Sequence, residues 1–102
     1  MAAWIVIAAG AASALLPLPQ APSERAAACE MTIFVAAEQI ILESPNPDTE
    51  ARLNAALIAW RERAEALAGY DEARHLADME ALRERVAGQT EALETCLAEV
   101  EK

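Results

Sequence analysis

The sequence has few glycines, histidines and aromatic residues, and each shortage narrows what the protein can be. Among 102 residues there are three glycines, four aromatic residues and one histidine. No segment alternates valine, isoleucine or threonine with polar residues, so the pattern is typical of an all-α protein. The chain also has no glycine-rich phosphate loop, no Cys-x-x-Cys motif and too few histidines for a Ser/His/Asp catalytic set. We therefore expect a non-enzymatic protein without a cofactor.

The charge balance is strongly acidic. Seventeen acidic residues against eight basic ones give a formal net charge of −9 at pH 7. Such a surface repels a phosphate backbone, and no basic stripe with aromatic residues offsets the repulsion. We therefore expect no nucleic-acid partner. The basic residues are almost all arginine and alanine is abundant, a bias that indicates a GC-rich bacterial gene.

The N-terminal segment resembles a secretory signal. Met1–Leu18 carries no charged side chain, and its most apolar part is Trp4–Ala9. A membrane-spanning helix needs about 20 apolar residues, so this alanine-rich run suits a signal better. We assign residues 1–22 to a signal-like apolar segment with a proline-rich connector, and residues 23–102 to a helical domain. These features predict a periplasmic or secreted bacterial protein. No cleavage site stands out, and the alternative is an inner-membrane anchor in which the segment is retained.

The domain itself is predicted to be a small antiparallel bundle of three to four short helices. Ser23 can cap a first helix that ends at Ser44, before a proline. Asn46 can cap a second helix, which begins at a proline and ends near Gly69. Asp71 can cap the next helix. The short links force neighbouring helices to run antiparallel.

Each predicted helix has an apolar face with steps of three and four residues. The first face comprises Cys29, Ile33, Ala37 and Ile40, widened by Met31, Phe34, Ile41 and Leu42. The second comprises Leu53, Leu57, Trp60, Ala64 and Leu67. We expect Trp60 in the core, with a partner-binding anchor as the alternative. The last face comprises Met79, Leu82, Val86, Gln89, Leu93, Cys96 and Val100, and the Met79–Val100 stripe also allows self-association as a coiled coil.

Whether the last helix is broken at Gly88 depends on whether the two cysteines form a disulfide. The three-four spacing continues through Gly88, which favours one long helix, but glycine weakens a helix interior and Thr90 with Glu91 can begin a new one. In an exported protein, Cys29 and Cys96 are expected to form a disulfide, and the alternative is two buried free thiols in a cytoplasmic protein. With about 1.5 Å of rise per residue, an unbroken last helix would hold Cys96 some 27 Å from Cys29. A disulfide needs Cα atoms within about 7 Å, so it predicts a turn at Gly88. We favour the disulfide and the turn.

His75 is the only histidine, and Asp71 and Asp78 lie four and three residues from it. We expect a solvated helix surface there and no metal. A metal-binding protein centred on His75 is a remote alternative. The favoured function is binding or supporting another cell-envelope protein through a helix face. The competing function is that of a membrane-tethered accessory subunit, and the sequence does not identify the protein partner in either case.

Overall fold

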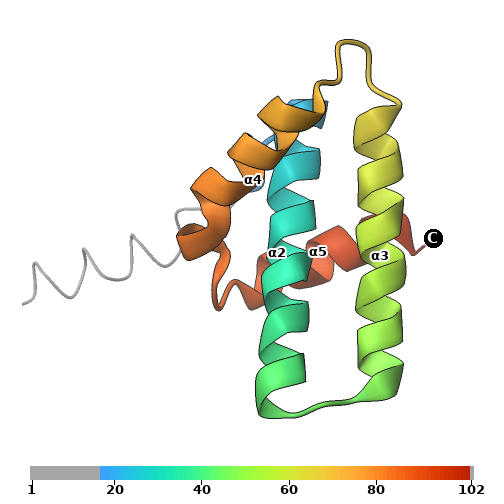
Figure 1. Cartoon of the computed structure of the whole chain (residues 1–102), viewed down its shortest axis with the longest axis vertical. Helices are drawn as coiled ribbons and strands as arrows, with labels where there is room; N and C mark the ends of the chain where they lie inside the picture. Colours follow the sequence, from blue (N-terminus) through green and yellow to red (C-terminus); the bar gives the residue numbers. More distant parts are fainter. Residues whose placement is uncertain (1–16, 102) are drawn as a thin grey trace, which may run out of the picture.

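The computed structural model describes residues 17–101 as four α-helices joined by short links (Figure 1). The helices are α2 (Pro22–Glu43), α3 (Pro47–Glu65), α4 (Glu72–Val86) and α5 (Thr90–Val100). The predicted all-α class and the small helical bundle are confirmed. Most of the signal-like segment, residues 1–16, lies outside the described residues.

Local capping signals explain where the middle helices begin. The side chain of Asn46 accepts a hydrogen bond from the backbone N–H of Thr49 at 3.1 Å, and Pro47 opens α3. Asp71 caps α4 in the same way, accepting from the N–H of Arg74 at 2.9 Å. Both caps are the ones expected. The predicted Ser23 cap is wrong, because α2 begins at Pro22 and Ala21 is its capping residue.

Helix α2 is the central element. In Figure 1 it stands between α4 on one side and α3 on the other, while α5 crosses the α2–α3 pair. All three other helices pack on α2, whereas α3 and α4 hardly touch one another. Ala26, Ala27 and Ala28 are buried in α2, and their small side chains allow the neighbouring helices to approach closely. Because α3 and α4 diverge on α2, a groove lies between them.

A few large side chains fill the core. Trp60 is 2% exposed and donates its indole N–H to the backbone carbonyl of Cys96 at 3.0 Å, so its predicted core position is confirmed. The expected apolar face of the first helix is wrong at its far end. Ile41 and Leu42 are 56% and 82% exposed, because α3 is the only one of the other three helices that lies beside this end of α2.

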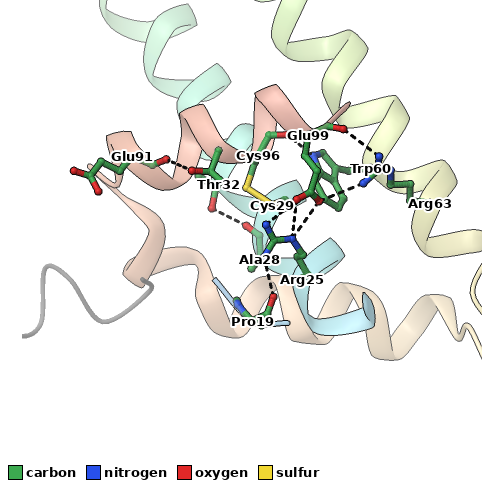
Figure 2. The surroundings of a disulfide bond; sticks show 11 residues. Pro19, Arg25, Ala28, Cys29, Thr32, Trp60, Arg63, Glu91, Cys96 and Glu99 are labelled. Atoms are coloured by element: carbon green, nitrogen blue, oxygen red, sulfur yellow. Dashed lines mark hydrogen bonds and ion pairs between the residues drawn. A yellow bond between two sulfur atoms is a disulfide. The ribbon is translucent and has the colours of Figure 1, made fainter. Parts of the chain in front are cut away.

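The last predicted helix is divided at Gly88. Helix α4 ends at Val86, and Gly88 has a φ of +73°, in the left-handed region that glycine enters without a steric penalty. After this turn α5 crosses α2, and Cys96 forms a disulfide with Cys29 at a Cα–Cα distance of 5.4 Å (Figure 2). The turn and the disulfide therefore occur together, as the helix lengths predicted.

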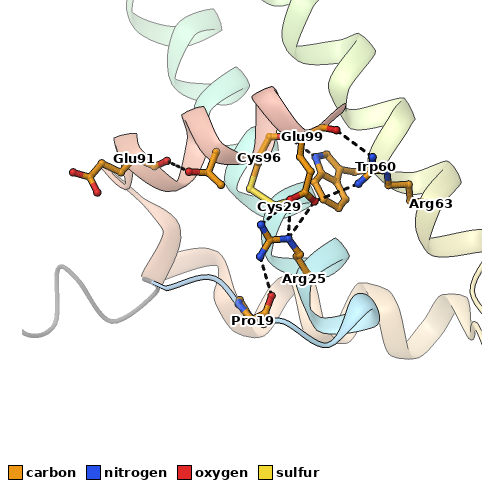
Figure 3. A network of polar contacts seen from close by, with 9 residues as sticks. Pro19, Arg25, Cys29, Trp60, Arg63, Glu91, Cys96 and Glu99 are labelled. Atoms are coloured by element: carbon orange, nitrogen blue, oxygen red, sulfur yellow. Dashed lines mark hydrogen bonds and ion pairs between the residues drawn. A yellow bond between two sulfur atoms is a disulfide. The ribbon is translucent and has the colours of Figure 1, made fainter. Parts of the chain in front are cut away.

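The connector before α2 is partly built into the folded body. Leu18 is 6% exposed and belongs to the core. The guanidinium of Arg25 donates to the carbonyl of Pro19 at 3.1 Å and to the carboxylate of Glu99 at 2.7 Å (Figure 3). Arg63 adds a second ion pair to Glu99 at 3.2 Å. These contacts fasten the connector and the end of α5 to the same part of the bundle.

Candidate functional site: a buried ionic cluster beside an apolar groove

Four polar side chains from separate parts of the chain meet inside the bundle. We call them the Glu30 cluster: Glu30 of α2, Arg61 of α3, Tyr70 of the α3–α4 link and His75 of α4. The helix arrangement brings them together, since α3 and α4 pack on either side of the central helix α2. The Asp71 cap fixes the start of α4 and with it the position of His75.

Glu30 is the centre of the cluster. One carboxylate oxygen, Oε1, lies 2.8 Å from Nε2 of His75, and the other, Oε2, accepts from Nε of Arg61 at 2.9 Å. The side chains of Glu30 and His75 are each 5% exposed, whereas that of Arg61 is 31% exposed. The hydrogen bonds that Arg61 donates to Glu30 raise the pKa of Arg61 further above its already high range. A buried carboxylate is tolerated here because both of its oxygens have partners.

Tyr70 covers the His75 side of the cluster. The two ring centroids are 5.6 Å apart and the ring planes are tilted by 54°. The hydroxyl oxygen of Tyr70 is buried, and within the part of the chain that the structure describes it has no hydrogen-bond partner. Loss of water raises the pKa of Tyr70, and the nearby positive charge of Arg61 partly opposes that shift.

The predicted place of His75 on a solvated surface is wrong. His75 is 6% exposed, and its Nε2 atom is directed at Glu30 of another helix, not at Asp71 or Asp78 of its own neighbourhood. Within residues 17–101, no group of three or more His, Cys, Asp or Glu side chains is arranged to hold a metal ion.

An apolar groove opens beside the cluster, where α3 and α4 diverge on α2. We call it the α3–α4 groove, and its volume is about 590 Å³. Its apolar lining comprises Met31 and Phe34 of α2, Leu57 and Ile58 of α3, and Leu76 and Met79 of α4. Its charged lining comprises Glu30, Arg61, Glu62, Glu65, Glu80 and Arg83. Ile58 is 54% exposed and Leu76 is 45% exposed, so one large apolar side chain stands open to water on each wall.

A second hollow, of about 710 Å³, lies on the other side of the cluster. Its lining includes the connector residues Pro17 and Pro19, both Tyr70 and His75, and the α4 residues Arg74 and Arg85. The Glu30 cluster thus lies between the two openings, with Glu30 and Arg61 on the groove side and His75 and Tyr70 on the hollow side.

The sequence predicted the disulfide residues but missed the centre of the cluster. Cys29 and Cys96 are both fully buried, at the α2–α5 contact. Glu30 had a signal that could have marked it: it is the only charged residue between Arg25 and Glu38. A lone charge in so apolar a stretch of helix requires a buried partner, and the partners come from α3 and α4.

Comparison of the chain with family models, with curated proteins and with solved structures finds no match. Among the helices of residues 17–101, none is both long enough and apolar enough to cross a membrane.

Proposed function

We propose that this chain is a small exported, acidic, non-enzymatic protein that binds another cell-envelope protein by holding an amphipathic helix of that protein in the α3–α4 groove. The observation that carries the proposal is the presence of Ile58 and Leu76, both exposed, on opposite walls of one apolar groove. Apolar side chains gathered around a groove are typical of protein-binding surfaces.

The dimensions of the groove suit a helix. Along α3 its lining extends from Leu57 to Glu65, which corresponds to about 12 Å of helix axis. That length accommodates about two turns of a partner helix, which would present side chains at positions i, i+3 or i+4, and i+7. Met31 and Met79 lie in the groove lining, and their flexible thioether side chains can adapt to the shape of an incoming residue.

Charge supports a protein partner other than a second copy of the chain. Four carboxylates and two guanidinium groups line the groove, and the whole chain has a net charge of −9. Two copies would therefore repel one another at this surface. An amphipathic helix with neutral or basic flanks would not be repelled by the groove.

An oxidising compartment is supported by the disulfide, since such bonds persist in the periplasm and outside the cell. The signal-like N-terminal segment points the same way, to a periplasmic or secreted bacterial protein. The tethered alternative also has an observation in its favour. Because Leu18 is in the core, a retained apolar segment would leave the folded body directly at Pro17 and keep the bundle close to the membrane.

The test is site-specific photo-crosslinking in the native host. A photoreactive amino acid is placed at Ile58, and a matched one at Leu42, which is exposed and apolar but does not line the groove. We expect the Ile58 probe to join a helical segment of an envelope protein, and Leu76→Asp to abolish that adduct. Adducts that are the same from both positions, or an Ile58 adduct that persists in Leu76→Asp, would overturn the proposal. So would an absence of adducts from Ile58.

A further inference from the structure

The two walls of the α3–α4 groove have the same spacing but different charge. On α3 the residues that line the groove include the series Ile58, Glu62 and Glu65, and on α4 they include Leu76, Glu80 and Arg83. Both series step four and then three residues, which places an apolar residue and two charged residues along one edge of each helix. The two walls therefore have the same geometry. They differ in charge at the third position, where α3 has Glu65 and α4 has Arg83.

The negative charge of the α4 edge is partly neutralised within the protein. Arg83 lies 2.9 Å from Glu38 of α2 and 3.4 Å from Glu80 of its own helix, and its guanidinium lies over the ring of Phe34 at 5.4 Å. The carboxylate of Glu80 therefore has a basic neighbour already, and Arg83 has two acidic ones. Less negative charge is therefore left on this edge for a partner than on the α3 edge.

The α3 edge keeps its negative charge. Glu62 and Glu65 are exposed, and neither forms an ion pair with a basic side chain of the described residues. The nearest basic residue of the groove, Arg61, is directed inward to Glu30 through its Nε and Nη2 atoms. Burial of that carboxylate fixes the direction of Arg61, so Glu65 keeps an electrostatic interaction with Arg61 but forms no ion pair with it.

We infer that the helix held in the groove is basic, with lysine or arginine along the flank that faces Glu62 and Glu65 and an apolar face directed at Met31 and Phe34. This inference rests on the proposed function. The two carboxylates lie one helical turn apart, so basic residues at positions i and i+3 or i+4 of the partner match them. The α4 edge, by contrast, tolerates a neutral flank.

The experiment uses designed model helices, titrated into the purified chain and followed by fluorescence anisotropy. Each labelled peptide has about 14 residues, about 21 Å of helix, with the same leucine face and with lysine, glutamine or glutamate on the flank. We expect the lysine peptide to bind roughly three- to tenfold tighter than the glutamine peptide, from two exposed charge pairs. The difference should disappear on going from about 0.01 M to about 1 M salt, as the Debye length falls from about 30 Å to about 3 Å.

Two matched double variants locate the effect. Glu62→Gln/Glu65→Gln removes the α3-edge charges, and Glu84→Gln/Glu94→Gln removes two exposed charges that do not line the groove. We expect only the first to abolish the preference for lysine. Because all four side chains are exposed, both variants should keep the thermal stability of the parent chain.

The outcomes distinguish the helix-binding function of the groove from its preference for a basic helix. If the glutamine and lysine peptides bind equally well and Ile58→Asp weakens both, the helix-binding groove stands and its preference for a basic partner is wrong. The preference is also wrong if the glutamate peptide binds best, or if Glu84→Gln/Glu94→Gln has the same effect as the α3-edge variant. If no peptide binds, the groove is not a helix-binding site, and both the function and this inference are overturned.

Discussion

Glu30 and His75 are 45 residues apart in the sequence, and their side chains meet in the core with Oε1 and Nε2 separated by 2.8 Å. The contact joins α2 to α4, and Arg61 on the other carboxylate oxygen joins α2 to α3. The two helices that form the groove walls are thus both fastened to one buried carboxylate. Their separation, and with it the width of the groove, depends on that residue.

Replacing Glu30 should destabilise the fold strongly. Glu30→Gln leaves Arg61 and His75 facing an amide that carries no charge. Because Arg61 is partly exposed and can turn to water, we expect a loss of about 1–3 kcal/mol. Chemical denaturation followed by circular dichroism measures the loss. The exposed control Glu84→Gln should stay within about 0.5 kcal/mol of the parent chain.

A compensated variant separates the ionic role of Glu30 from its volume. In Glu30→Met/His75→Leu both buried polar partners become apolar, while Arg61 can turn its partly exposed guanidinium to water. We expect this double variant to be more stable than Glu30→Gln alone. A double variant at least as unstable as the single one would show that the ionic contacts are not what Glu30 contributes.

The disulfide should account for a large share of the stability. It closes a loop with a sequence separation of 67 residues, for which loop-closure entropy predicts a contribution of about 4 kcal/mol. Cys29→Ala/Cys96→Ala should lose about that amount in a denaturation experiment. Because Trp60 donates to the carbonyl of Cys96, its fluorescence emission should shift to the red if α5 detaches.

The control for that measurement keeps the disulfide and removes the hydrogen bond. Trp60→Phe removes the indole N–H donor but leaves the disulfide in place. Any decrease in the free energy of unfolding of this variant therefore measures the packing of Trp60 and its hydrogen bond, without the disulfide. Both cysteines are fully buried, so we also expect the native disulfide to resist mild reductants until the chain opens. Rapid reduction of the folded protein with no loss of stability would contradict this account.

Much of the fold follows from local signals in the sequence. Asn46 and Asp71 cap helices where their side chains predict it, and Pro47 begins α3, because such signals need only residues a few positions away. The turn at Gly88 is different, since the spacing of apolar residues passes through it unbroken. It was predicted because the disulfide and the helix lengths left no other geometry.

The groove and the cluster depend on contacts that no local pattern contains. His75 has charged neighbours along α4, which is the pattern of a solvated face, yet it is buried because Glu30 of a distant helix meets it. Ile41 and Leu42 continue the apolar face of α2, yet they are exposed because, of the other three helices, only α3 lies beside that end. Helix periodicity identifies a face that is able to be buried, and tertiary packing decides how much of it is covered.

The connector should contribute to stability. Leu18→Ala removes a core side chain, and because a terminal segment can readjust we expect the low end of the usual range, about 2 kcal/mol. The matched control is Gln20→Ala, at an exposed position of the same segment. Denaturation of the two variants measures the difference. Equal stability would mean that residues before α2 do not belong to the folded body.

Ionisation of Tyr70 should destabilise the fold at alkaline pH. It is the only tyrosine, so absorbance near 295 nm follows its ionisation alone. Loss of water around its ring raises the pKa of Tyr70 above the ordinary value of about 10. The unfolded chain therefore releases the phenolic proton at a lower pH than the native chain. The contribution of the protonated Tyr70 to the free energy of unfolding is complete below about pH 10. It is lost as pH rises through the pKa of Tyr70 in the native protein.

Two substitutions test the cause of that shift. In Tyr70→Phe the alkaline loss of stability should disappear from this window, because no phenol ionises. Glu65 adds to the rise in the pKa of Tyr70 through its negative charge, so Glu65→Gln should lower that pKa while Glu84→Gln leaves it unchanged. If Tyr70 ionises in the native protein at the same pH as in the denatured chain, its hydroxyl is hydrated in solution and the alkaline loss of stability has another origin.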